Sequence, residues 1–288
     1  MPPTDSLSAS TVAILGLGLM GGSLALALRG RCASMLGVDP DAETCQAALE
    51  RQVVDQVSAE PGALLPQANL VVLAAPVGAI IQLLQDLPVL HPGAAVVLDL
   101  GSTKSAIVHT MQTLPERFDP VGGHPMCGKE RGSLHNADAA LYQGAVFALT
   151  ALPRSSVSAR SLAEQLVSVV GAHPLWMEAE THDRWVAATS HLPYLLANAL
   201  AQATPPEAQP LVGPGLRSTT RLAATPRSMM LDVLATNREN LLASLQSFRQ
   251  QLDRLEGCLV DGDWRALELY LSQGADRYAW LVESRRAE

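Results

Sequence analysis

Short apolar runs alternate with helix-like segments along the first 178 residues of the chain. Strands that alternate with helices in this way predict a parallel sheet with helices on both faces. A helix over about 156–170 and a last strand over 174–177 complete this predicted domain. The predicted strands before that helix are 12–15, 35–38, 70–74, 95–98, 118–121 and 145–149.

Beyond residue 178 the apolar positions take on a helical period. Long helices are predicted over 180–203, 226–260 and 263–283. The fold class is therefore α/β, with a Rossmann-like doubly wound sheet over 1–178 and an all-helical substrate and dimerisation domain over 179–288. An apolar stripe in the middle helix predicts a homodimer, with an ordinary intramolecular core as the alternative. The stripe consists of Leu241, Leu245, Phe248, Leu252, Leu255 and Leu259.

Composition narrows the class of protein. With 288 residues and 48% hydrophobic residues, the chain can fill two cores. A net charge of −8 without any basic run argues against a nucleic-acid partner. The longest uncharged stretch, 61–85, contains two prolines and an asparagine, so no membrane span is expected. Four scattered cysteines predict a reducing, cytoplasmic compartment and no metal site.

A glycine-rich turn follows the first predicted strand. Gly16 permits a tight turn, Gly18 lets the backbone approach a pyrophosphate, and Gly21 lets the next helix pack closely on the sheet. The N–H groups of that helix start, at Leu19 and Met20, are suited to bind phosphate. A signal peptide or membrane span is the alternative interpretation of residues 12–28, but no basic residue precedes this segment and four glycines interrupt it.

A carboxylate near the end of the second strand, Asp39, is placed to accept a hydrogen bond from a ribose 2′-hydroxyl. We therefore predict NAD as the cofactor and keep NADP as a possibility. Ala75 and Pro76 follow the strand 70–74 and are expected to line the same cofactor crevice, because ligands bind beyond the carboxyl ends of parallel strands.

Two more strand ends carry chemically useful side chains. Ser102 follows the strand 95–98 and is expected to cap the next helix, whose N-terminus would face the cofactor. Capping alone, without a role at the cofactor, is the alternative. His124 follows the strand 118–121 between glycines that would present it to a cleft. A plain surface histidine is the alternative reading of His124.

The helical half adds a histidine and two arginines. Pro193 interrupts a helical pattern, and a kink there would turn His191 toward a cleft, unless it is a merely tolerated kink. Arg217 and Arg221 are four residues apart and would share one helix face. Arginine suits a carboxylate clamp, although most exposed arginines are only solvated charge.

Taken in order, the motifs GLGLMGGS, DLGSTKS, GGHPMCG and SHLPY, followed by an arginine after threonines, resemble the prephenate and arogenate dehydrogenases of tyrosine biosynthesis. The resemblance covers roughly residues 12–255. It implies oxidation of the ring carbon that bears the hydroxyl, with loss of the ring carboxylate as CO₂. It further implies that His124 accepts a hydrogen bond or proton from the ring hydroxyl, and that Ser102 orients this hydroxyl and His124. His191 would line the substrate site. Arg221 would hold a substrate carboxylate, with Arg217 assisting.

The chain departs from some relatives at two positions. Lys129 stands where they have threonine, and Ser218 where they have an acidic residue. Both positions are expected near the substrate side chain, so Lys129 is a candidate substrate-binding residue and the choice between prephenate and arogenate stays open. Without room for a chorismate mutase or regulatory module, arogenate or dual specificity is slightly favoured.

Two other functions are possible. A β-hydroxyacid dehydrogenase of similar architecture would need a lysine in the helical domain, whereas the sequence has only Lys104 and Lys129. A non-enzymatic NAD(H)-binding sensor would keep the glycine turn but need neither a proton acceptor nor a substrate clamp.

Overall fold

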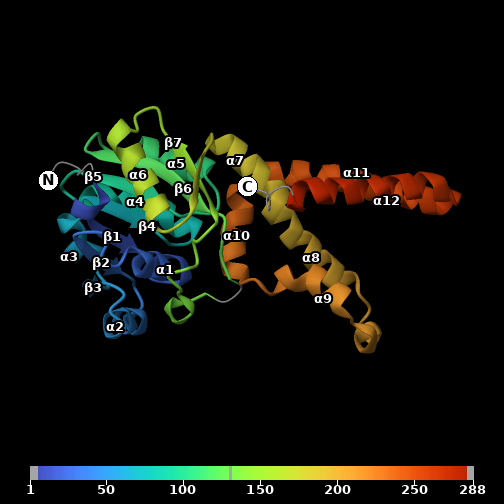
Figure 1. Ribbon diagram of the computed structural model, residues 1–288, viewed down its shortest axis with the longest axis horizontal. Helices are drawn as coiled ribbons and strands as arrows, with labels where there is room; N and C mark the ends of the chain where they lie inside the picture. Colours follow the sequence, from blue (N-terminus) through green and yellow to red (C-terminus); the bar gives the residue numbers. More distant parts are fainter. Residues whose placement is uncertain (1–5, 130–131, 284–288) are drawn as a thin grey trace. The chain divides into compact units, whose positions relative to one another are not determined.

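The computed structural model describes residues 6–129 and 132–283 of the chain. The chain divides into two compact units, one as far as Arg238 and the other from Glu239 onward. The first unit therefore contains the sheet together with several of the helices that follow it (Figure 1).

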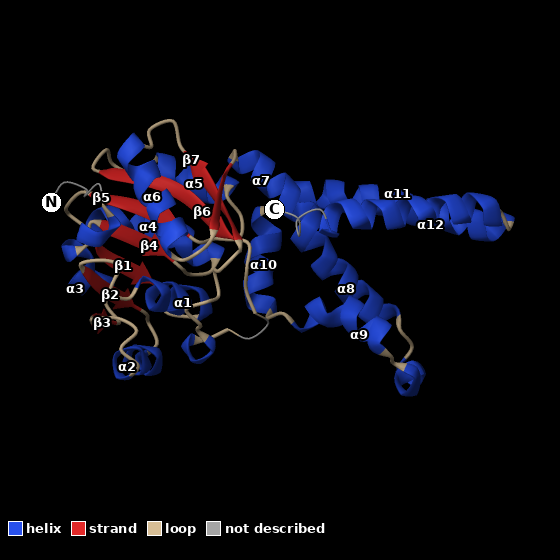
Figure 2. Cartoon of the chain, in the orientation of Figure 1, coloured by secondary structure: helices blue, strands red, loops and turns tan. Residues whose placement is uncertain are grey.

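The first unit is built on one twisted sheet, drawn as red arrows in Figure 2. Among the described residues this sheet has eight strands in the order β3-β2-β1-β4-β5-β6-β7-β8. The doubly wound α/β class predicted from the sequence is confirmed. The strands are β1 (Thr11–Leu15), β2 (Ser34–Val38), β3 (Gln56–Ser58), β4 (Leu70–Leu73), β5 (Ala95–Asp99), β6 (Phe118–Pro125), β7 (Val146–Ala151) and β8 (His173–Trp176).

The strands from β3 to β6 are parallel, but β7 runs antiparallel to β6, and β8 is parallel to β7. The prediction of a parallel sheet is therefore wrong at this edge. A parallel neighbour needs a crossover connection, usually a helix, and within the described part of the β6–β7 connection only the short 3₁₀ helix Leu134–Asn136 forms. The short edge strand β3 was not predicted, because three residues give too little pattern.

Alternate side chains of each strand enter two separate cores, as the pleat of a strand requires. Val12 and Ile14 pack on one face, and Ala13 and Leu15 on the other. Helices cover both faces, the first face with α1 (Leu19–Leu28), α2 (Ala42–Glu50) and α6 (Val157–Val169), and the second with α3 (Pro61–Leu64), α4 (Val77–Leu90) and α5 (Ser105–Gln112).

The strand order reverses at β1, which lies between β2 and β4. The chain thus winds outward in opposite directions from this point, and a crevice opens beyond the carboxyl ends of β1 and β4. Dinucleotides bind at such a switch point, and the glycine turn after β1 lies there.

The second core face continues into the helices after the sheet, since Ala179, Tyr194, Met230 and Val233 belong to the same buried cluster. These residues lie on α7 (Ala179–Val186), α8 (Leu192–Ala203) and α10 (Arg227–Thr236), with α9 (Pro214–Thr220) between the last two. The predicted helix over 226–260 is broken at Asn237, where α11 (Arg238–Asp261) takes over.

Between α7 and α8 the chain forms a single π-helical turn, Ala187–His191. The N–H of Leu192 donates to the carbonyl of Ala187, five residues back. Pro193 follows immediately, and its ring would clash with the carbonyl of Thr189 in a regular helix. The wider turn gives that carbonyl room, and π turns of this kind are frequent at functional sites.

The second unit consists of α11 and α12 (Trp264–Tyr278), followed by a π turn at Ala279–Glu283. Apolar side chains remain exposed along both helices, among them Leu252, Leu259, Trp264 and Leu269. In the part of the chain that the structure describes, no helix is long and apolar enough to cross a membrane.

Candidate active site

The glycine turn after β1 has the shape that the sequence predicts. Gly16 has a φ of +95°, in the left-handed region, and a Cβ added there would lie 2.6 Å from the carbonyl oxygen of Ala74. A Cβ added at Gly21 would lie 1.9 Å from the carbonyl oxygen of Gly16. These two glycines are thus required by the fold of the turn and by the packing of α1 against β4.

Gly18 differs, because a Cβ added there would meet nothing within 4 Å. It occupies the N-cap position of α1, and no side chain caps this helix. The first-turn N–H groups, including those of Leu19 and Met20, therefore point with the positive end of the helix dipole into open space beside Gly18. This cradle fits a pyrophosphate.

Asp39 lies at the mouth of the same crevice, just after β2. Its Oδ2 accepts from the N–H of Leu17 at 2.8 Å and its Oδ1 from the N–H of Asp41 at 3.0 Å. The carboxylate is thus tied to the glycine turn, with lone pairs left for a hydroxyl donor. Ala75 and Pro76 follow β4 on the other side of the crevice. The backbone nitrogen of Ala75 lies 3.3 Å from a Cβ added at Gly16, so this segment directly adjoins the glycine turn.

A cavity of about 350 Å³ opens beside the end of β6. Its lining brings together Ser102 from the β5–α5 connection, His124 from β6 and His191 from the π turn. Met229, Met230 and Val233 of α10 supply an apolar wall. Three of the residues predicted for catalysis or substrate binding thus meet at one cavity, although they lie far apart in the sequence.

Ser102 does not cap α5, so that prediction is wrong. The helix begins at Ser105, three residues further on, and its N-cap position is Lys104. The carboxylate of Asp183, from α7, takes the place of a local cap: it accepts from the N–H of Lys104 at 2.7 Å and from the N–H of Ser105 at 2.8 Å. Ser102 is left with its side chain at the cavity.

The basic candidates lie outside the cavity lining. Arg217 is exposed near the end of α9, and Arg221 is exposed at the start of the 3₁₀ turn Arg221–Ala224. The two arginines are therefore not on one continuous α-helix. Leu222, next to Arg221, does line the cavity. Lys129 lies in the loop after β6 and pairs with Asp138 at 3.1 Å, with both side chains partly exposed.

A buried ion pair, not predicted from the sequence, supports the backbone on which His124 stands. The ammonium of Lys104 donates to the carboxylate of Asp99 and, at 2.6 Å, to the carbonyl of Gly123. Asp99 in turn accepts from the N–H of Gly123 at 3.0 Å and from the N–H of Gly101 at 2.7 Å. Both side chains are fully buried. Burial lowers the pKa of Lys104, and the adjacent Asp99 opposes that shift.

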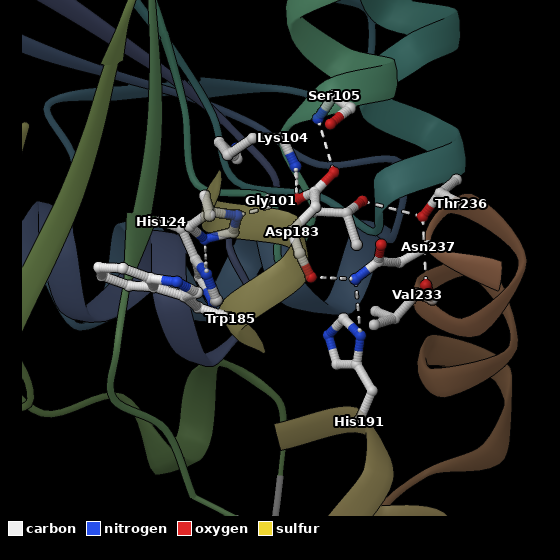
Figure 3. Close-up of polar contacts among 12 residues, drawn as sticks. Gly101, Lys104, Ser105, His124, Asp183, Trp185, His191, Val233, Thr236 and Asn237 are labelled. Carbon is white, nitrogen blue, oxygen red and sulfur yellow. Dashed lines mark hydrogen bonds and ion pairs between the residues drawn. The ribbon is translucent and has the colours of Figure 1, made fainter. Parts of the chain in front are cut away.

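A second group of residues that the sequence did not single out holds the His124 ring itself (Figure 3). Nδ1 of His124 lies 2.8 Å from Nε2 of His182, and Nδ1 of His182 lies 2.8 Å from Oδ1 of Asp183. His182 and Asp183 are both 1% exposed. Their signal in the sequence is weak: two adjacent polar residues in a helix have no recognisable spacing from a histidine 58 residues earlier.

His191 is held by Asn237, which follows α10. The amide nitrogen of Asn237 donates to the carbonyl of Asp183 at 2.7 Å, and the same nitrogen lies 3.2 Å from Nδ1 of His191. Since that nitrogen is a donor, Nδ1 of His191 accepts, and a neutral His191 carries its proton on Nε2. Burial lowers the pKa of His191 to about 4, so the ring is neutral at physiological pH.

His124 is neutral as well. Burial lowers its pKa well below the ordinary value, and the neighbouring His182, Lys104 and His191 lower it further, whereas Asp183 has the opposite effect. The site therefore contains two neutral imidazoles at one cavity. One can accept a proton, as oxidation of an alcohol requires, and the other can donate a hydrogen bond.

Two models of known protein families match consecutive parts of the chain. Residues 24–176 match the family model described as the nucleotide-binding domain of prephenate dehydrogenase. Residues 178–273 match the model described as the prephenate dehydrogenase dimerization domain.

Individual relatives agree over nearly the full chain. The prephenate dehydrogenase of Bacillus subtilis is 29% identical over 278 residues, covering 92% of this chain and 74% of the relative. A solved prephenate dehydrogenase from A. aeolicus, in complex with hydroxyphenyl propionate and NAD⁺, has a TM-score of 0.89 and 28% identity, covering 96% and 99% of the two chains. Arogenate dehydrogenase of Synechocystis has a TM-score of 0.81 and 30% identity, covering 94% and 99%. With its glycine turn, its histidine-lined cavity and both domain matches, the chain belongs to the prephenate dehydrogenase family.

Proposed function

We propose that this chain oxidises and decarboxylates prephenate, arogenate or both with NAD, giving 4-hydroxyphenylpyruvate or tyrosine. The observation that supports this most directly is the cavity lined by Ser102, His124 and His191 in a member of this family. The cofactor crevice fits NAD, because Gly18 leaves room for a pyrophosphate at the start of α1. Bound NAD supplies the hydride acceptor.

The residues of the chain supply the acid–base chemistry and the orientation. His124 accepts the proton of the ring hydroxyl as that carbon is oxidised, which removes the charge that would otherwise build up on oxygen. Ser102 orients the hydroxyl toward His124. His191 offers the N–H on Nε2 to a substrate acceptor, and the methionines of α10 exclude water from the ring. Loss of CO₂ makes the ring aromatic and drives the reaction.

A direct assay tests this proposal. Purified protein is incubated with NAD and either prephenate or arogenate, and NADH formation is followed by absorbance beside a reaction without substrate. Turnover with at least one substrate supports the proposed function, and the ratio of the two kcat/KM values assigns the preference. Saturable NAD binding without turnover of either substrate would instead support the NAD(H)-binding sensor.

The β-hydroxyacid dehydrogenase alternative finds no support at the site. Lys104 is buried against Asp99 behind the strand ends, and Lys129 lies on an exposed loop. Neither is among the residues that line the cavity.

Arg221 is proposed to hold a substrate carboxylate, assisted by Arg217, with Lys129 near the substrate side chain. We expect Arg221→Ala to raise the substrate KM by about tenfold or more, the equivalent of about 1.4 kcal/mol, with little change in kcat. An arginine that binds a substrate carboxylate stabilises the ground state and the transition state equally, so its loss raises KM. Steady-state kinetics of Arg221→Ala and of the control variant Arg160→Ala, on α6, measure this change in KM. An unchanged KM would remove Arg221 from the binding site.

NAD is expected to give a higher kcat/KM than NADP. The carboxylate of Asp39 accepts from a free 2′-hydroxyl and repels a 2′-phosphate. Asp39→Asn should reduce the difference in kcat/KM between NAD and NADP, because the amide keeps a hydrogen-bond acceptor but loses the negative charge. Initial rates with both cofactors, on the wild type and on this variant, provide the measurement. A wild-type preference for NADP would contradict the assignment.

A homodimer formed through the helical half is also proposed, as the dimerization-domain match suggests. Leu252 and Leu259 of α11 are 48% and 58% exposed in the single chain, and such apolar side chains favour burial against a second copy. Light scattering at micromolar concentration should give twice the chain mass, and Leu252→Glu should shift it toward the monomer. A monomeric wild type would refute the proposal.

The four free cysteines support a cytoplasmic location as part of the same proposal.

A further inference from the structure

Asp183 is held in one orientation and kept ionised by its surroundings. Its two carboxylate oxygens accept from the N–H groups of Lys104 and Ser105, at the start of α5. Burial alone would raise the pKa of Asp183, but hydrogen bonds from His182, Lys104 and Ser105 outweigh it and hold the pKa below its ordinary value. The positive end of the α5 dipole favours the anion further.

An ionised carboxylate can only accept hydrogen bonds, and this fact fixes the proton on His182. Nδ1 of His182 lies 2.8 Å from Oδ1 of Asp183, so Nδ1 must carry the proton. A neutral His182 then has a bare lone pair on Nε2. That lone pair points at Nδ1 of His124, 2.8 Å away.

The tautomer of His124 depends on that of His182. With His182 neutral, Nδ1 of His124 donates to Nε2 of His182, because a lone pair on each nitrogen would leave two acceptors facing each other. A neutral His124 therefore has its second lone pair on Nε2. The side chain of His124 lines the cavity, so this lone pair is available to a substrate hydroxyl.

We propose that His182 and Asp183 are positioning residues for the reaction, which hold His124 in the tautomer whose Nε2 accepts the substrate proton. This inference rests on the proposed function for its catalytic meaning, but the tautomer itself is a property of the protein without ligands. When Nε2 takes the proton, the hydroxyl O–H bond breaks, an N–H bond forms and His124 becomes a cation. Its Nδ1–H still donates to Nε2 of His182, and the anionic Asp183 stabilises the charge through that ring.

The charged and titratable groups around His124 agree with this arrangement. Lys104 before α5, His182 on α7 and His191 in the π turn all disfavour a cation at rest, whereas Asp183 favours one. His124 is therefore neutral before the reaction. Asp183 is the anion that favours the cation formed on His124 afterwards. In serine proteases the analogous carboxylate likewise orients a histidine without taking its proton.

Two variants of His182 test the proposal. His182→Leu removes the acceptor for His124 Nδ1–H, and we expect kcat to fall by about 10- to 100-fold with little change in the KM for NAD. His182→Gln keeps a side-chain oxygen that can accept a hydrogen bond from His124 Nδ1–H, so its kcat should lie between those of His182→Leu and the wild type. His109→Leu, at an exposed histidine on α5, is the matched control and should behave like the wild type.

Asp183→Asn tests the charge separately. Oδ1 of Asp183 accepts from both His182 and the N–H of Lys104, so an asparagine that keeps its oxygen there preserves the tautomers and loses the anion. The cation formed on His124 then lacks its stabilising charge, and we expect kcat to fall by about tenfold or more. If this variant does not fold, because α5 has lost the acceptor for Ser105, the comparison of His182→Leu with His182→Gln tests the proposal instead.

The direct readout is imidazole ¹⁵N NMR of the ligand-free protein near neutral pH, with resonances assigned by single histidine substitutions. In the wild type we expect His124 to show a protonated Nδ1 and an unprotonated Nε2, and His182→Leu to lose this fixed pattern. A protonated Nε2 on His124 in the wild type would overturn the proposal, as would full kcat in His182→Leu. Failure of the wild type to oxidise either substrate would instead count against the proposed function, since the tautomer is measured without substrate.

Discussion

Replacing His124 with asparagine is expected to lower kcat by about 10²- to 10⁴-fold, the usual loss when a positioned acid–base group is removed. Asparagine is close to histidine in size, and its amide can still donate to Nε2 of His182. It has no basic nitrogen, so it cannot take the hydroxyl proton. The cofactor crevice lies at the switch point beside β1, and NAD binding should therefore be unchanged.

Steady-state kinetics and NAD titration by calorimetry separate these two effects. His109→Asn, on the exposed side of α5, is the matched control and should keep wild-type turnover. Near-normal kcat in His124→Asn would show that the proton acceptor is another group. His191 would then be the next candidate, since it lines the same cavity.

The pH profile gives an independent check on His124. Only the neutral imidazole can accept a proton, and the pKa of His124 is lowered well below its ordinary value of 6.5 by burial and by the neighbouring histidines and Lys104. Activity should thus persist as the pH falls through 6.5 and decline only at the lower, shifted pKa. An acidic limb of kcat/KM above pH 6.5 would contradict this.

The second large effect is expected at the glycine turn. Gly18→Ala should weaken NAD binding by at least about tenfold, or about 1.4 kcal/mol, with little loss of stability. The added methyl meets nothing within 4 Å in the protein, and φ at Gly18 is −68°, which alanine adopts readily. The methyl instead occupies the space into which a pyrophosphate must come.

Gly21→Ala offers a contrast within the same turn. Its methyl would lie 1.9 Å from the carbonyl oxygen of Gly16, so the backbone must move, and a marked fall in Tm is expected. Gly62→Ala in α3, where the nearest atom lies at 3.8 Å, is the neutral control. Calorimetric NAD titration and thermal melts distinguish the three variants. Wild-type NAD affinity in Gly18→Ala would mean that the cofactor does not approach this backbone.

The apolar pattern by itself determined most of the sheet and the position of the cofactor turn. Short continuous apolar runs such as 70–73, bounded by Asn69 and Pro76, indicate buried strands, because both faces of a parallel sheet are covered. Gly16 and Gly21 were also evident, since their requirement is local: a left-handed φ and a contact within one turn. His124 was predicted because the apolar run 118–121 ends shortly before it, at the carboxyl edge where ligands bind, although β6 itself continues through His124 to Pro125.

Only the tertiary structure decided what holds His124. Asp183 caps a helix that starts 78 residues earlier in the chain, in place of the predicted Ser102. His182 meets His124 across 58 residues, and Lys104 reaches Gly123 across 19. Periodicity and capping patterns report on contacts within a few residues, whereas these partners meet only because α7 packs beside the start of α5 and the end of β6. The direction of β7 was decided in the same way, by a connection in which the described residues form no full crossover helix.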